Sequence, residues 1–272
     1  MLTHTHKEVF LTRRHELDMD HLLRVQCICN YMEEAAGAHA DALGVGISRL
    51  LQDDLTWALA KMRLILHRRP GPGENVRVVT WPVGLDRAQF RRDFILYDSR
   101  DAILASAVTQ WVVMGTRSRR LERFPFYIAE LRPKDPPLAQ ENGDIRIPAL
   151  GDSGPTGCPV ELSFPVRLAD IDQNRHVNNG RYIDFSLEAA DHAGASGELC
   201  RIDIIFRAEG LRGDVIAVRT APEADCPGSF IHGLFRASDA RELARARTVF
   251  CLAQRQFCVD TRTDSVQYVA HS

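Results

Sequence analysis

Hydrophobic and polar positions follow the same succession of patterns twice along the chain. In the first half, a strand-like run at 8–17 precedes a segment from about 22 to 43 in which apolar residues recur every three or four positions, closed by Gly44. This spacing predicts an amphipathic helix. Four β-rich runs separated by turn residues then follow, at 56–67, 75–83, 89–97 and 102–114. We therefore expect one helix and about five strands in this half.

The second half repeats this order. A strand is predicted near 160–168 and a helix at about 178–193. The β-rich runs that follow lie at 199–207, 215–220, 229–237 and 243–252. A stretch rich in proline and polar residues separates the two halves. We predict an N-terminal unit at 1–131, a linker at 132–159 and a C-terminal unit at 160–272.

Short matches between the halves indicate that the chain is a duplication. Asp18 and Asp20 precede Asp170 and Asp172 by 152 positions, whereas the Glu-Ala-Ala run at 34–36 precedes the run at 188–190 by 154 positions. The matches fall at the same junction in both halves. We interpret the difference of two residues as a longer loop before the second helix.

The second predicted helix is apolar on nearly all sides. Tyr182, Phe185, Ala189 and Ala193 form one apolar face, and further apolar residues widen it. A helix of this kind is buried, so a curved antiparallel sheet has to wrap around it. The predicted fold class is α+β, with one buried helix and one curved sheet in each unit.

Composition and charge exclude some classes of function. The chain has 34 Lys+Arg against 36 Asp+Glu and a formal net charge of -2, which does not favour nucleic acid as a partner. No apolar run reaches the roughly 18 residues that span a bilayer. The first residues lack the features of a secretory signal, and the seven scattered cysteines suit reduced thiols, so we expect a cytoplasmic protein. The histidines and cysteines lack the spacing of metal ligands, and we predict no metal and no cofactor.

The polar run DIDQNRHVNNGRY at 170–182 carries the strongest chemical signal. It lies where a strand is predicted to give way to a helix. In an extended loop, alternating residues share one side, so the side chains of Asp172, Asn174 and His176 are expected to converge. The backbone N–H groups at a helix start are free and carry the positive end of the helix dipole. Capping of the helix alone is the competing explanation, because Asn and Asp are common at such positions.

The stretch DIDQNRHVNNGRYIDF, with LEAA and FRAEGLRGD after it, resembles the signature of the acyl-acyl carrier protein thioesterases of plants and bacteria. The first half is similar to that family in the same order, through ALAKMRLILHRRPGPGENVRVVTWPVG, FRRDFILYDSRDAILASAVTQWVVM and TRSRRLERFP. The resemblance implies a double hotdog fold. It also implies hydrolysis of the thioester that joins a fatty acyl chain to the phosphopantetheine arm of acyl carrier protein, which would be the partner.

The resemblance also assigns roles to particular residues. Glu209 in FRAEG matches the acidic residue of the family and is the expected general base, with Asp172 as the competing candidate. His176 would be its hydrogen-bond partner and proton shuttle, and Asn174 would position water or the carbonyl. The backbone N–H groups of Val177 and Asn178 are expected to polarise the thioester carbonyl.

One position departs from the family pattern. Plant members carry a cysteine directly after this glutamate, and here the residue is Gly210. Without a thiol at that position, direct attack by water is favoured over an acyl-enzyme. Cys200, the nearest cysteine in sequence, is not expected to act as the nucleophile.

The first unit is expected to lack the catalytic set. At an offset of 152 residues, Leu22 and Arg24 stand in place of Asn174 and His176. The unit would then shape the acyl pocket. Basic clusters are candidates for docking an acidic carrier protein, and they contain Arg68, Arg69, Arg91, Arg92, Arg119, Arg120 and Arg123.

Several alternatives stay open at this point. The substrate is acyl-acyl carrier protein in the preferred interpretation, acyl-CoA in the second, and a third treats the chain as a non-catalytic acyl-binding or carrier-binding protein. The sequence does not fix the acyl chain length. The protein is expected to be a monomer or a homodimer, since a double hotdog already contains the pairing that single hotdog chains reach by dimerising.

Overall fold

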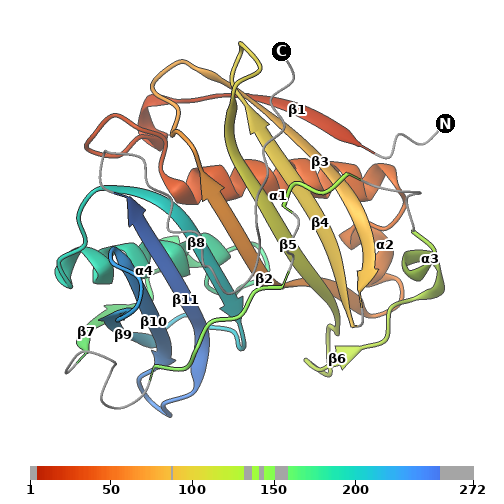
Figure 1. Cartoon of the computed structure of the whole chain (residues 1–272). Helices are drawn as coiled ribbons and strands as arrows, with labels where there is room; N and C mark the ends of the chain where they lie inside the picture. The colour runs from red at the N-terminus through yellow and green to blue at the C-terminus, as the bar shows by residue number, and fades with distance from the viewer. Residues whose placement is uncertain (1–4, 87, 132–136, 141–143, 151–158, 252–272) are drawn as a thin grey trace.

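The computed structural model describes residues 5–86, 88–131, 137–140, 144–150 and 159–251 (Figure 1). The N-terminal unit opens with strand β1 and the long helix α1, with a 3-10 turn (Arg14–Glu16) between them. Its elements are β1 (His6–Leu11), α1 (Val25–Ala42), α2 (Ile47–Leu51), β2 (Leu55–Leu66), β3 (Asn75–Asp86), β4 (Gln89–Tyr97), β5 (Ile103–Gly115), β6 (Leu121–Glu122) and α3 (Phe126–Ala129). The helix and the main strands confirm the pattern expected from the sequence. The short elements α2, α3 and β6 were not predicted.

The C-terminal unit repeats this order without the short elements. A 3-10 turn (Leu168–Asp170) again lies between the first strand and the helix. The elements are β7 (Val160–Pro165), α4 (Asn179–His192), β8 (Glu198–Phe206), β9 (Val215–Pro222), β10 (Ser229–Arg236) and β11 (Glu242–Cys251).

All the main strands form one antiparallel sheet with an internal pseudo-twofold symmetry. The order is β1-β3-β4-β5-β2-β8-β11-β10-β9-β7, so the second unit mirrors the first across the β2/β8 pair. Figure 1 shows the two halves of the sheet meeting at these two strands. Arg63 pairs with Asp203 at this seam, and their side chains form an ion pair of 2.9 Å. The two units are therefore joined through continuous backbone hydrogen bonding.

The two long helices pack against one face of the sheet and contact each other. In α4, Tyr182, Phe185 and Ala189 are buried, as the apolar pattern predicted. The core cluster combines residues of both helices with residues of both halves of the sheet. A buried helix wrapped by a curved antiparallel sheet thus occurs twice, which confirms the expected α+β tandem hotdog arrangement.

The described part of the linker packs on the other face of the sheet. Residues 137–140 bind the first unit, because the Trp81 indole N–H donates to the Pro137 carbonyl at 2.7 Å and Arg91 donates to the Gln140 carbonyl at 2.6 Å. Farther along, Ile145 and Ile147 are buried against Ile231 of the second unit. These residues strap the outside of the sheet across both units.

Two further observations bear on the expectations above. Cys200 of β8 and Cys251 of β11 form a disulfide, so the expectation of uniformly reduced thiols was wrong for this pair. Cys27 and Cys29, both in α1, are free thiols. None of the helices within the described residues is long and apolar enough to cross a membrane.

Candidate active site

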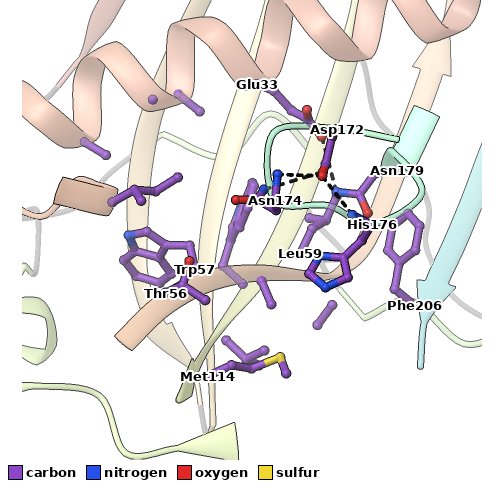
Figure 2. Close-up of a pocket in the computed structure, with 18 of the residues that line it drawn as sticks. Glu33, Thr56, Trp57, Leu59, Met114, Asp172, Asn174, His176, Asn179 and Phe206 are labelled. Atoms are coloured by element: carbon purple, nitrogen blue, oxygen red, sulfur yellow. Dashed lines mark hydrogen bonds between the residues drawn. The ribbon is translucent and has the colours of Figure 1, made fainter. Parts of the chain in front are cut away.

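The loop before α4 is built around the side chain of Asp172. Its Oδ1 atom accepts hydrogen bonds from the backbone N–H groups of Asn174 at 2.8 Å and His176 at 3.2 Å. The Asp172 N–H donates to the His176 carbonyl at 2.8 Å, and Arg175 adopts a left-handed conformation with φ of 66°. Figure 2 shows Asp172 at the centre of these bonds. The carboxylate therefore closes a tight turn that holds His176 in place.

The first unit contains the same turn without the same chemistry. Asp18 Oδ1 accepts from the N–H groups of Asp20 and Leu22, both at 3.0 Å, and His21 has a φ of 60°. Asp18 is thus the structural equivalent of Asp172, and the offset through the loop is 154 residues, as it is for the helices. The offset of 152 and the longer second loop inferred from the sequence were wrong. Leu22, not Arg24, is the counterpart of His176.

His176 and Glu209 come together at the candidate site. Glu209 lies after β8, and its carboxylate Oε2 is 3.1 Å from His176 Nε2. Two bonds fix this segment: the Val177 N–H donates to the Gly210 carbonyl at 2.9 Å, and Arg236 donates to the Glu209 carbonyl at 2.8 Å. The structure therefore brings together two residues that are 33 positions apart and that the sequence proposed as partners.

The equivalent of Glu209 in the first unit is Arg69. Leu23 donates to the carbonyl of Pro70 at 2.8 Å, as Val177 does to that of Gly210. Pro70 therefore corresponds to Gly210, and the residue before it, Arg69, corresponds to Glu209. Arg69 forms an ion pair with Asp18. The first unit thus has the same turn but lacks both the histidine and the glutamate.

Arg119 is a site residue that the sequence analysis did not identify. Its guanidinium contacts Glu209 Oε1, and its Nη2 atom is 3.1 Å from His176 Nε2. It belongs to the turn after β5, in the N-terminal unit, and it was taken only as part of a possible docking surface. No local pattern links it to residues 57 and 90 positions away. Only the folded arrangement reveals this contact.

The predicted oxyanion donors are not available. The Val177 N–H donates to the Gly210 carbonyl and the Asn178 N–H donates to the Asp170 carbonyl, both at 2.9 Å. The prediction that these two groups polarise the thioester carbonyl was therefore wrong, because each already has a protein acceptor. Asn178 instead caps α4, where its side chain accepts from the Gly180 N–H at 2.8 Å. Among the described residues, none accepts a hydrogen bond from the backbone N–H of Asn179.

The remaining predicted residue, Asn174, lies on the wall of the same cavity. Its side-chain Nδ2 atom is 3.5 Å from Asp172 Oδ2, a weak contact. The amide is therefore open to the cavity and can still bind a water molecule or a carbonyl group. Asp172, Asn174, His176 and Glu209 all line this cavity.

The cavity has a volume of about 1410 Å³ and lies between the two units. Its walls come from α1, β2 and β5 of the first unit and from the loop, the start of α4 and the end of β8 in the second (Figure 2). Apolar side chains such as Trp57, Leu59, Met114 and Phe206 line it beside the polar loop. A cavity of this size, with apolar walls and a small set of polar groups, suits an acyl chain attached to a reactive carbonyl.

Electrostatics keep His176 neutral. Burial lowers the pKa of His176, the positive charge of Arg119 lowers it further, and the Asp172 carboxylate opposes both. Because the ordinary value lies near 6.5, the ring is largely uncharged at pH 7. A neutral imidazole can donate through one nitrogen and accept through the other. This is the state required of a proton shuttle.

Another carboxylate faces the cavity from α1. Glu33 accepts a hydrogen bond from Asn179 Nδ2 at 3.4 Å (Figure 2). Burial raises the pKa of Glu33, the bond from Asn179 lowers it, and the nearby Asp172 charge raises it. Within the described part of the chain, no cluster of three or more His, Cys, Asp or Glu side chains is arranged to hold a metal ion.

The position of the family cysteine is filled by a neighbouring side chain. A Cβ atom at Gly210 would lie 2.8 Å from the Tyr182 hydroxyl and 3.0 Å from Val177 Cγ2. The Tyr182 hydroxyl accepts the Gly210 N–H at 2.9 Å, and this tyrosine is buried. A cysteine at 210 would therefore require the tyrosine to move. The local packing is built for glycine.

Most of the arginines proposed for carrier docking have other roles. Arg68 binds Glu74 and Asp98, and Arg91 binds Asp93. Arg92 is buried and contacts His39 and Thr80. With Arg69 and Arg119 also engaged, the predicted docking set reduces to the exposed Arg120 and Arg123. Arg117, in the same segment, has an 86% exposed side chain.

Comparisons with known proteins show the family of the chain. A family model described as the acyl-ACP thioesterase N-terminal domain matches residues 3–130, and one described as the C-terminal domain matches residues 155–251. A palmitoyl-acyl carrier protein thioesterase of Cuphea hookeriana is 30% identical over 255 residues, which cover 89% of this chain and 61% of that protein. Oleoyl-acyl carrier protein thioesterase 1 of Arabidopsis thaliana is 28% identical, over 90% of this chain and 76% of that protein.

Solved structures show the same fold. The 12:0-ACP thioesterase from Umbellularia californica superimposes with a TM-score of 0.77 at 25% identity, covering 91% of this chain and 97% of that chain. An acyl-ACP thioesterase from Bacteroides thetaiotaomicron gives a TM-score of 0.75 at 21% identity, covering 90% and 97%. The chain spans 61% of the length of the first two curated relatives that it matches.

Proposed function

Because the chain belongs to the acyl-ACP thioesterase family, we propose that it hydrolyses fatty acyl-acyl carrier protein to a free fatty acid and the carrier protein. The observation that carries this proposal is the contact of 3.1 Å between His176 Nε2 and Glu209 Oε2 on the wall of a large cavity. The first unit keeps the loop but has Leu22 and Arg69 at the equivalent positions. The fold therefore does not need the histidine and the glutamate, which supports a chemical role for them.

In the proposed reaction, a water molecule attacks the thioester carbonyl carbon. Glu209 is the general base, because its carboxylate oxygens retain lone pairs that can accept a proton from water. The carbonyl oxygen gains negative charge as the new bond forms. The bond between carbon and sulfur then breaks, and His176 relays the proton to the departing pantetheine thiolate. The atoms balance, because one water molecule supplies the hydroxyl group of the fatty acid and the proton of the thiol.

The carbonyl oxygen needs donors other than the two first expected. The N–H of Asn179 is the first of α4, and the positive end of the helix dipole lies beside it. Asn179 also lines the cavity. We assign this N–H, together with the Asn174 side chain, to the carbonyl.

Carrier docking is proposed at the turn between β5 and β6. Thr116, Arg119 and Leu121 of this segment border the cavity. Arg117, Arg120 and Arg123 are exposed beside it and present positive charge. An acidic carrier bound there would insert its acyl-bearing arm directly into the cavity, and charge would steer its approach.

Replacing the proposed catalytic pair tests the mechanism. Glu209→Gln and His176→Ala should each lower kcat/KM on an acyl-acyl carrier protein by roughly 100-fold or more, the scale of general acid-base catalysis. The measurement is release of free fatty acid, with the thermal midpoint as a check on folding. Glu188→Gln is the matched control, because Glu188 lies on the exposed side of α4 and should keep its activity. Wild-type rates in both site variants would overturn the assignment.

The location and assembly of the protein stay predictions. The curated relatives named above are described as chloroplastic, and for this chain a cytoplasmic location is the proposal. A monomer or a homodimer is expected, because the sheet already joins two hotdog units within one chain.

A further inference from the structure

Arg119 has an unusual backbone as well as an unusual position. It lies in the turn 116–120 with a φ of 52°, a left-handed conformation that costs a non-glycine residue roughly 1–2 kcal/mol. The turn is held by bonds from the Gly115 N–H to the Arg120 carbonyl at 3.0 Å and from the Thr116 N–H to the Asp54 carbonyl at 2.8 Å. His21 and Arg175 adopt the same conformation in their turns, and at Arg119 it sets the direction in which the side chain leaves the turn.

That side chain reaches across the boundary between the units. Its guanidinium contacts Glu209 Oε1 and lies 3.1 Å from His176 Nε2. Glu209 Oε2 in turn lies 3.1 Å from the same His176 nitrogen. The three groups form a closed triangle in which one cation from the N-terminal unit touches both proposed catalytic residues of the C-terminal unit. Arg117, two residues earlier, instead forms an ion pair with Asp54 at 3.3 Å.

We propose that Arg119 is a positioning residue of the active site, which holds the Glu209 carboxylate toward His176 and keeps the His176 ring uncharged. This inference rests on the proposed function. It assigns to the N-terminal unit a part in the chemistry as well as in shaping the acyl cavity.

Two physical effects follow from this arrangement. The guanidinium occupies one carboxylate oxygen, so the other stays directed at His176 and the carboxylate cannot rotate freely. A positive charge next to Nε2 also disfavours the protonated ring, whereas the carboxylates of Glu209 and Asp172 favour it. Among the residues that the structure describes, these three groups are the charges that face His176. Burial lowers the pKa of His176 first and Arg119 lowers it next.

The sign of the expected pH effect follows from these charges. Activity requires a neutral His176, so kcat/KM rises with pH through the His176 pKa. Removing Arg119 removes one of the two influences that lower this pKa. The acidic limb of the pH profile should therefore move to higher pH in Arg119→Ala. Arg119→Lys keeps the charge, and its limb should stay close to that of the wild type.

The test combines three variants with two readouts. The variants are Arg119→Ala, Arg119→Lys and the control Arg146→Ala, which removes an arginine whose side chain is 83% exposed and pairs with Asp144. The first readout is the pH profile of kcat and KM on a small acyl thioester that needs no carrier protein. The second is the His176 pKa measured by NMR titration of the free protein, with the signal assigned by its loss in His176→Ala.

We expect Arg119→Ala to lower kcat by roughly 10-fold to 100-fold and to raise the measured His176 pKa. Arg119→Lys should restore the pKa and part of kcat, and Arg146→Ala should change neither. An unchanged His176 pKa in Arg119→Ala, with kcat and KM for the small thioester also unchanged, would overturn the proposal. If the wild type hydrolyses no thioester, the proposed function fails, while the NMR titration still decides the role of Arg119.

Discussion

At the scale of single residues, the duplicated loop separates structural from chemical roles. Asp18 and Asp172 make the same pair of bonds to backbone N–H groups, although only the second unit carries a histidine and a glutamate beside the loop. Asp18 makes these bonds in a unit that has no histidine or glutamate beside the loop. Closing the turn is therefore enough to explain an aspartate at this position. The comparison therefore favours Glu209 over Asp172 as the general base.

Asp172→Asn tests this distinction, because asparagine keeps the accepting Oδ1 atom and removes the charge. If Asp172 is structural, the variant should keep its activity within about 10-fold, whereas Glu209→Gln loses about 100-fold. Asp172→Ala, which removes the acceptor, should lower the free energy of unfolding by about 1–3 kcal/mol. Fatty acid release and urea unfolding measure the two effects. An Asp172→Asn variant as inactive as Glu209→Gln would make Asp172 the base.

The sequence analysis proposed His176 and Glu209 as partners, but it gave some of the residues around them the wrong role or the wrong counterpart. His176 and Glu209 could be proposed because the resemblance covers both of their motifs. The equivalence of Asp18 and Asp172 was missed because an Asp-x-Asp sequence occurs in both halves. Aligning these two sequences placed the halves two residues away from their structural correspondence. Whether the N–H groups of Val177 and Asn178 are free depends on backbone hydrogen bonds, which residue identity does not reveal. Arg119 was missed because it approaches the site only through the packing of two units.

At the scale of elements, the alternating pattern located the strands within a few residues. β4 was predicted at 89–97 and observed at Gln89–Tyr97, because turn residues flank this β-rich run. The helix α2 was missed because five residues are too few to show a helical period. Between the loop before its long helix and its second strand, the first unit has 14 more residues than the second unit, and α2 lies among them. Ile47 and Leu51 of α2 line the cavity, so this added element helps to shape it.

The pairing of β2 with β8 shows that a duplicated chain can carry different residues at equivalent positions. Arg63 and Asp203 occupy equivalent positions in the two units, 140 residues apart. The same separation relates His67 and Arg207, whose backbone N–H groups both donate to the neighbouring strand. Arg63 and Asp203 also pair with each other across the pseudo-twofold axis. In a symmetric dimer two identical residues would meet there, and like charges would repel. A single chain can place opposite charges on the two sides of the axis.

Asp203→Ala should destabilise the protein strongly. The Asp203 side chain is fully buried and binds Arg63 at 2.9 Å and Arg201 at 2.6 Å. Burial alone would raise the pKa of Asp203, but the hydrogen bond and charge of Arg201, with the charge of Arg63, lower it overall. We expect a loss of about 3–5 kcal/mol in urea unfolding at pH 7, because two arginines lose a buried partner.

The control for this experiment is Glu161→Ala. Glu161 forms a half-exposed ion pair with Arg219 at 2.8 Å, and its loss should change stability by less than about 1 kcal/mol. The lowered pKa of Asp203 contributes stability above its unfolded value near 3.9, and this is lost as the pH falls through the folded value. The difference between wild type and Asp203→Ala should therefore shrink in acid. Equal losses in the two variants at pH 7 would contradict the account of the seam.

At the scale of the whole molecule, two units share one site. The second unit supplies His176, Glu209 and the start of α4, whereas the first supplies most of the cavity wall and Arg119. The linker straps the other face of the sheet across both units, so the two halves are held together by the sheet and by the strap. Sequence patterns could indicate the duplication. They could not show that Arg119 of the first unit contacts His176 and Glu209 of the second.

The most direct test of the account is release of free fatty acid by the wild-type protein from matched acyl-acyl carrier protein and acyl-CoA substrates over a range of chain lengths. The account predicts turnover of acyl-acyl carrier protein with a higher kcat/KM than for acyl-CoA, and loss of both activities in Glu209→Gln. A clear preference for acyl-CoA would show a thioesterase with a different substrate. Binding of the carrier protein without release of fatty acid at any chain length would contradict the central claim.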